Sequence, residues 1–133
     1  MVANRLPVDR VVDPGGTTHW RRSPGGLVSA LAPVMTQHDG AWIGWPGDVV
    51  DDDLDTFEHE GMTLIPLAIG QQEYEEYYEG FSNATLWPLY HDLVAKPEFH
   101  REWWDSYKVV NRRFAEAAAE VAAPDAVVWV QGY

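Results

Sequence analysis

A pair of glycines stands at the start of an apolar segment with helical spacing. Gly25 and Gly26 follow Ser23 and Pro24, and apolar residues then recur every three or four positions up to Met35. Glycine leaves backbone N–H groups open to a ligand, and a helix start carries positive partial charge, so this pattern suits a phosphate or diphosphate. A plain glycine turn is the alternative interpretation.

A cation and a tryptophan are expected near the ends of two strands. Arg5 follows the apolar start of the chain, and Trp45 follows Ile43 and Gly44. Ligands in open α/β sheets bind at the carboxyl ends of the strands, where a planar guanidinium suits a phosphate and an indole can wall a sugar pocket. A surface arginine and a core tryptophan are the alternatives.

The elements that would position these residues alternate between strand and helix. Apolar runs predict buried strands at 2–6, 41–44, 63–69 and 126–130. Helical patterns predict helices at 27–35, at 71–80, from a cap at Asn83, and from Pro97 to about 121. Segments 8–22 and 48–60 are predicted loops. This alternation predicts an α/β fold with a mainly parallel sheet.

Composition narrows the classes of protein. The 133 residues fit one domain, and the net charge of −12 disfavours binding to nucleic acid or to anionic membranes. Cysteine is absent, which excludes disulfides and thiolate nucleophiles. No apolar run reaches the roughly 18 residues of a membrane span, and the start lacks a signal-peptide pattern. We therefore expect a cytoplasmic protein, and a homo-oligomer stays open.

No metal site is expected. The five histidines lack paired ligand spacing. The acidic run Asp51, Asp53 and Asp55 resembles the start of a calcium loop, but Thr56 and Met62 stand where that loop needs glycine and glutamate. A solvated acidic loop is the better interpretation.

Six segments in fixed order resemble one family: Ala-Asn-Arg-Leu-Pro at 3–7, Ser-Pro-Gly-Gly-Leu at 23–27, Trp-Ile-Gly-Trp-Pro-Gly at 42–47, Glu-Tyr-Tyr at 76–78, Phe-Ser-Asn-Ala-Thr-Leu-Trp-Pro at 81–88 and Trp-Val-Gln-Gly-Tyr at 129–133. Together they look like the amino-terminal domain of trehalose-6-phosphate synthases. The resemblance implies a Rossmann-like domain of a GT-B glycosyltransferase. It also implies transfer of glucose from UDP-glucose to glucose-6-phosphate, with retention and without metal or cofactor.

The resemblance assigns site residues by position in these segments. Those implied for the acceptor glucose-6-phosphate are Arg5, Trp45, Tyr78 and Trp87. Those implied for the donor UDP-glucose are Gly25 and Gly26. The family has an aspartate that contacts the acceptor where this chain has Gly132. No catalytic nucleophile is implied.

Residues 1–133 are thus expected to form a partial acceptor-side domain, with the donor-binding domain beyond them. On its own this fragment is expected to be inactive, since half a cleft cannot hold both substrates. Two alternatives stay open, and Gly132 bears on both. One is a non-catalytic module with a sugar-phosphate-binding or regulatory role. The other is a related transferase with a different phosphorylated acceptor, such as a glycerol phosphate.

Overall fold

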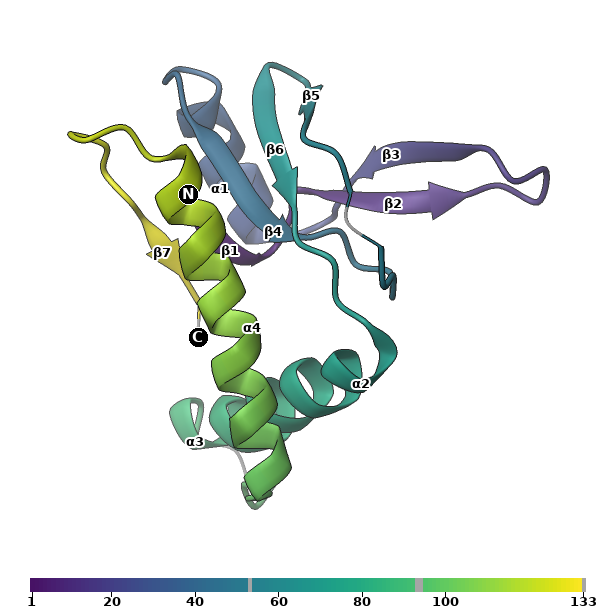
Figure 1. The fold of residues 1–133 in the computed structure, drawn as a ribbon, viewed down its shortest axis with the longest axis vertical. Helices are drawn as coiled ribbons and strands as arrows, with labels where there is room; N and C mark the ends of the chain where they lie inside the picture. The colour runs from purple at the N-terminus through teal and green to yellow at the C-terminus, as the bar shows by residue number, and fades with distance from the viewer. Residues whose placement is uncertain (53, 93–94, 133) are drawn as a thin grey trace.

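A five-stranded sheet forms the centre of the molecule (Figure 1). The computed structural model describes residues 1–52, 54–92 and 95–132. The strands lie in the order β5 (Phe57–His59), β6 (Met62–Pro66), β4 (Ala41–Trp45), β1 (Val2–Arg5) and β7 (Val130–Gln131). All neighbours pair in parallel except β5, which runs antiparallel to β6. The predicted α/β fold with a mainly parallel sheet is confirmed.

Helices cover both faces of this sheet, as a buried parallel sheet requires. Helix α1 (Gly26–Met35) packs on one face, and α4 (Arg101–Val121) lies on the other (Figure 1). Successive strand residues point to opposite faces. Trp42 therefore joins the core under α1, while Ile43 joins the core under α4, and both side chains are buried.

The second helical region differs from its prediction. A short α2 (Gln71–Glu73) runs directly into a π-helix, η1 (Tyr74–Leu86), which is followed by α3 (Trp87–Tyr90). Asn83 lies inside η1, so its predicted role as a helix cap is wrong. The helix expected from Pro97 begins only at Arg101, because His100 is extended and the Glu98 N–H donates to the Ala84 carbonyl instead.

The two segments predicted as loops contain strands. Residues 8–22 form an antiparallel hairpin of β2 (Val8–Val12) and β3 (Thr18–Arg22), which projects from the side of the sheet (Figure 1). Its turn lies at the predicted position, where the Gly16 N–H donates to the Asp13 carbonyl at 2.8 Å. Only Val8 of the hairpin is fully buried, so its strands lack the alternating apolar pattern that would have predicted them. Strand β5 similarly lies within the predicted acidic loop, whose Asp53 is outside the described residues.

The last strand is shorter and more exposed than predicted. Only Val130 and Gln131 form β7, and Val127 and Val130 are 90% and 67% exposed. The predicted burial of 126–130 is therefore wrong for this structure. Within the described residues β7 pairs on one side only, with β1, which leaves its other edge uncovered. Tyr133, which ends the sixth segment, lies outside the described residues.

Strands β1 and β4 approach closely at Gly44, and this contact gives a test of the fold. A Cβ at Gly44 would lie 2.6 Å from the Arg5 carbonyl carbon and the Leu6 nitrogen. We expect Gly44→Ala to lower the free energy of unfolding by about 1–3 kcal/mol, because backbone atoms cannot yield as a flexible side chain does. Urea unfolding at equilibrium measures this change.

Gly40→Ala is the matched control, because a Cβ there would meet only the end of the Met35 side chain, at 3.7 Å. We expect it to change the free energy of unfolding by less than about 0.5 kcal/mol. Equal stability of the two variants would contradict the proposed close approach.

Candidate functional site

Arg5 and Trp45 end neighbouring strands and lie against each other. The register of β1 and β4 pairs the two residues, and the Arg5 Cζ lies 4.9 Å from the centroid of the Trp45 ring. Trp45 is buried and its Nε1 donates to the Asp48 carbonyl at 2.8 Å, so the ring is a fixed support. The Arg5 side chain, whose guanidinium lies over this ring, is 38% exposed. A cation held in this way is available to an anionic ligand.

Two tyrosines of η1 extend this aromatic surface. The Tyr78 ring packs edge-on against Trp45, with centroids 4.9 Å apart, and the Tyr74 ring lies 5.6 Å from Trp45. The structure thus brings together Arg5, Trp45 and Tyr78, three of the residues singled out from the sequence. Tyr74 was missed, although it precedes Tyr78 by four positions and so shares its side of the helix.

Two further residues shape the surroundings of Arg5, and sequence reasoning missed both. The Arg5 Nη2 donates to the Asp9 Oδ1 at 2.7 Å. Gly47 has a φ of +96°, and a Cβ at this position would overlap the guanidinium. Gly47 therefore leaves the space that Arg5 fills. Its place in the Trp-Pro-Gly segment was a signal for it, whereas nothing in the sequence pattern pointed to Asp9.

The glycine pair lies at the start of α1 and faces open space. Gly25 is the residue before the first helical turn, and a Cβ on either Gly25 or Gly26 would meet no atom within 4 Å. The first turn of α1 contains no acidic residue, so its positive partial charge is not opposed locally. The Ser23 Oγ donates to the Asp9 Oδ1 at 2.5 Å, which ties the glycine loop to the carboxylate that also holds Arg5.

Trp87 is the fourth residue that the resemblance implies for the acceptor. It begins α3, at the opposite end of η1 from Tyr74, and its ring stacks on His91 with centroids 3.6 Å apart. Its side chain is 44% exposed, so it presents an aromatic face to the surface. Trp87 thus follows the end of η1, whereas Tyr74 and Tyr78 lie near its start.

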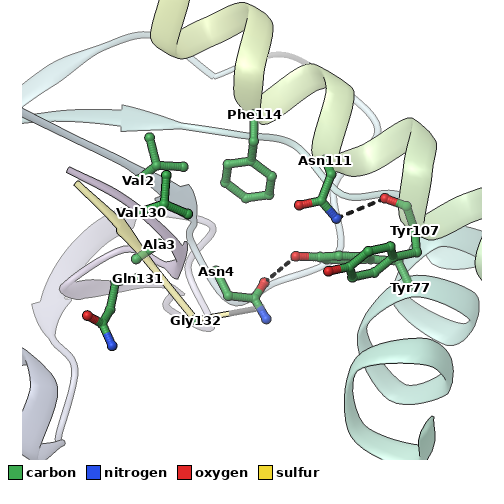
Figure 2. A pocket seen from close by; sticks show the side chains of 10 residues that line it. All are labelled: Val2, Ala3, Asn4, Tyr77, Tyr107, Asn111, Phe114, Val130, Gln131 and Gly132. Atoms are coloured by element: carbon green, nitrogen blue, oxygen red, sulfur yellow. Dashed lines mark hydrogen bonds between the residues drawn. The ribbon is translucent and has the colours of Figure 1, made fainter. Parts of the chain in front are cut away.

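A cavity of about 170 Å³ opens beside β1 and β7, and Gly132 lies on its wall (Figure 2). The other lining residues are Val2, Ala3, Asn4, Tyr77, Tyr107, Asn111, Phe114, Val130 and Gln131. Gly132 has a φ of +96° and open space around its Cβ position. An aspartate here would have room but would need a left-handed backbone, which favours glycine.

Tyr77 is the buried polar group of this cavity. Its hydroxyl donates to the Asn4 Oδ1 at 2.9 Å (Figure 2), and the residue is only 2% exposed. Burial raises the pKa of Tyr77 well above its usual value of 10. The phenol is therefore a neutral hydrogen-bond donor at physiological pH. Together with the amides of Asn4 and Asn111 it gives the cavity groups suited to sugar hydroxyls.

Two structural features are absent from the described part of the chain. Residues 1–52, 54–92 and 95–132 contain no group of three or more histidine, aspartate or glutamate side chains placed to hold a metal ion. Among the same residues, no helix has both the length and the apolar character needed to cross a bilayer.

Comparison with known proteins identifies the family. The family model described as glycosyltransferase family 20 matches residues 1–133. The chain belongs to glycosyltransferase family 20. Over 138 aligned residues it is 59% identical to the trehalose-6-phosphate synthase of Mycolicibacterium gilvum, covering all of this chain and 27% of that protein. The chain thus spans about a quarter of the length of the curated relatives it matches.

Solved structures of this family share the fold. A UDP-forming α,α-trehalose-phosphate synthase from Burkholderia xenovorans, in complex with glucose-6-phosphate, matches with a TM-score of 0.77 and 30% identity. An E. coli structure bound with UDP-2-fluoro glucose matches with a TM-score of 0.71 and 27% identity. The matches cover 99% and 97% of this chain, and 27% of each of those chains. The fold of this family 20 chain is that of the amino-terminal domain of GT-B trehalose-phosphate synthases.

The pKa of Tyr77 gives this family 20 chain a predictable response to alkali. Unfolding returns the phenol to its usual pKa of 10, so the unfolded state loses this proton first and stability falls as pH rises above 10. We expect Tyr77→Phe to be less stable than the unchanged chain at pH 8 by about 1 kcal/mol, because Asn4 loses its donor. At pH 10.5 this gap should narrow by about 0.8 kcal/mol.

Urea unfolding of both proteins at the two pH values measures the gap. The difference between the proteins isolates Tyr77 from the other titrating groups, Tyr107 among them, whose pKa burial also raises. A gap that stays constant from pH 8 to pH 10.5 would show that the Tyr77 phenol is not held in its buried, neutral form.

Proposed function

We propose that this chain supplies the acceptor side of a trehalose-6-phosphate synthase. The proposed reaction transfers glucose from UDP-glucose to glucose-6-phosphate, with retention, and forms trehalose-6-phosphate. The observation that carries the proposal is the position of Arg5 at the carboxyl edge of the sheet, where its guanidinium lies over Trp45 and bonds Asp9 while 38% of the side chain stays exposed. The names of the family 20 relatives and the glucose-6-phosphate in one related structure support it.

Each proposed role follows from what a side chain can do at its place. Arg5 binds the acceptor phosphate through its free N–H groups. Trp45 and Tyr78 offer the flat apolar faces on which sugar rings rest. Trp87 contacts the acceptor from α3, for which its exposed ring is suited.

The donor side of the proposal rests on the glycine pair. Gly25 and Gly26 admit the diphosphate of UDP-glucose to the N-terminus of α1, where N–H groups and the helix dipole favour negative charge. On this proposal the phosphate charges are met by Arg5 and by the helix, without a metal or cofactor. We also propose a cytoplasmic location, because both substrates are charged phosphates that a membrane confines.

A related transferase with a smaller phosphorylated acceptor is the second candidate. Gly132 favours it, because a glycine at the cavity wall offers no carboxylate to sugar hydroxyls and its φ of +96° opposes a change to aspartate. A non-catalytic module that binds sugar phosphates is the third. Turnover by an enzyme completed with the missing part of a relative separates the three candidates. The first predicts turnover with glucose-6-phosphate, the second turnover with glycerol phosphate, and the third turnover with neither.

Substitution of Arg5 tests the acceptor site. In a hybrid enzyme, residues 1–133 replace the matching segment of the M. gilvum protein. We expect Arg5→Ala to weaken glucose-6-phosphate binding by about 1.5–3 kcal/mol, because a charge-assisted hydrogen bond to phosphate is lost. Binding of UDP should change by less than about threefold, because the donor lies at α1. Calorimetric titration of each ligand measures both effects.

Arg112→Ala is the matched control, because Arg112 is an exposed cation of α4 outside the site. It removes the same charge and should leave both affinities unchanged. Equal losses for the acceptor and the donor in Arg5→Ala would refute the assignment of Arg5 to the acceptor phosphate.

The 133-residue chain on its own should not catalyse glucosyl transfer. Transfer requires donor and acceptor held within near-attack distance, and this chain covers about a quarter of the relatives that carry the name of the enzyme. We expect no release of UDP above background from UDP-glucose and glucose-6-phosphate, with the hybrid enzyme as the positive control. Steady formation of trehalose-6-phosphate by the isolated chain would overturn the proposed half-site.

A further inference from the structure

One oxygen of the Asp9 carboxylate accepts two hydrogen bonds from different parts of the chain. Its Oδ1 accepts from the Arg5 Nη2 at 2.7 Å and from the Ser23 Oγ at 2.5 Å. The Asp9 side chain is 21% exposed, so water screens these bonds only in part. Arg5 ends β1, whereas Ser23 leads into Gly25 and the start of α1. The two sides of the proposed site therefore meet at this carboxylate.

The backbone holds Asp9 in a position to make both bonds. Asp9 lies on β2 beside its register partner Arg21 on β3, and the Ser23 N–H donates to the Pro7 carbonyl at 2.9 Å. The base of the hairpin thus brings Ser23 back beside Asp9. The Arg10 N–H also donates to the Pro46 carbonyl, which ties β2 to the end of β4.

Arg5 depends on Asp9 for its orientation. Within the described residues, the bond to Asp9 is the hydrogen bond that the guanidinium makes, and the buried Arg5 Nε has no partner. The Trp45 ring supports the guanidinium from one side, but a stacking contact does not fix its rotation about the ring normal. A directional bond to a carboxylate does fix it.

We propose that Asp9 is a positioning residue that holds Arg5 and the glycine loop in one geometry. Through Arg5 it sets the place of the acceptor phosphate, and through Ser23 it sets the place of the donor diphosphate. The inference rests on the proposed roles of Arg5 and of Gly25 and Gly26. A carboxylate that instead competed with the phosphate for the guanidinium would have the opposite effect on acceptor affinity, so the test separates the two roles.

The test is steady-state kinetics of the hybrid enzyme with glucose-6-phosphate and UDP-glucose. We expect Asp9→Ala to raise the KM for glucose-6-phosphate about tenfold and the KM for UDP-glucose about fivefold. Ser23→Ala should raise the KM for UDP-glucose about fivefold and leave the KM for glucose-6-phosphate within about twofold. Because both single changes remove the same Ser23–Asp9 bond, the double variant should have the donor KM of Asp9→Ala alone.

Conservative variants separate positioning from a merely structural effect. Ser23→Thr keeps the hydroxyl and should restore the donor KM. Asp9→Asn keeps an acceptor oxygen without the charge. Its KM values for both substrates should lie between those of the unchanged protein and those of Asp9→Ala. If Asp9→Ala does not fold, Asp9→Asn and the two Ser23 variants carry the test. Asp105→Ala, which removes an exposed carboxylate paired with Lys108 on α4, should leave both KM values unchanged.

Three results would overturn the inference. A lower KM for glucose-6-phosphate in Asp9→Ala would make Asp9 a competitor of the phosphate. An unchanged acceptor KM would leave Asp9 without a role toward Arg5. Donor effects of Asp9→Ala and Ser23→Ala that multiply in the double variant would show two independent contributions. Failure of the proposed function is recognised separately, because Arg5→Ala would then leave glucose-6-phosphate binding unchanged.

Discussion

The close parallel pairing of β1 with β4 is the contact on which the site depends. Gly44 has no side chain, so the backbone after Arg5 can approach β4 until the Leu6 N–H donates to the Trp45 carbonyl at 2.9 Å. Trp42, two residues before Gly44 and so on the same face of β4, secures the same crossing, since its Nε1 donates to the Arg5 carbonyl at 3.1 Å. With the strands locked in this register, Arg5 and Trp45 end at one edge and their side chains must meet.

An irregularity in β1 adds a second consequence. Val2 pairs with Ile43 and Arg5 with Trp45, so β1 uses three steps where β4 uses two. Successive residues of a regular strand point to opposite faces, and such a bulge changes which side chains share a face. Asn4 can therefore bond Tyr77 of η1 while its neighbour Arg5 also reaches the aromatic surface beside η1. The small cavity and the cation thus lie next to each other along β1.

The sequence predicted those elements whose buried side chains give the sequence a regular apolar pattern. Helix α1 and strand β4 were found because their apolar residues face a core with the period of a helix or a strand. The hairpin was missed because backbone bonds join its strands and few of its side chains are buried, so its sequence has no periodic apolar signal. The contact of Asp9 with Arg5 and Ser23 depends on that hairpin, so sequence spacing could not reveal it. The boundary predicted at Asn83 was also wrong, because η1 continues through this residue as a π-helix.

An anionic ligand in a chain of charge −12 requires a local arrangement of charge. Salt screens exposed charges beyond about 8–10 Å, so the groups close to the edge of the sheet decide the potential there. Arg5 is one such group, and the acid-free first turn of α1 is another. Asp9 offsets part of the Arg5 charge, which lowers the attraction of a phosphate at long range. On the proposed role of Arg5, Asp9 offsets this weaker attraction by orienting the guanidinium. A guanidinium held by a carboxylate and a ring loses little conformational freedom when a phosphate binds. The hairpin that sets Asp9 beside Ser23 therefore contributes to the proposed site through geometry.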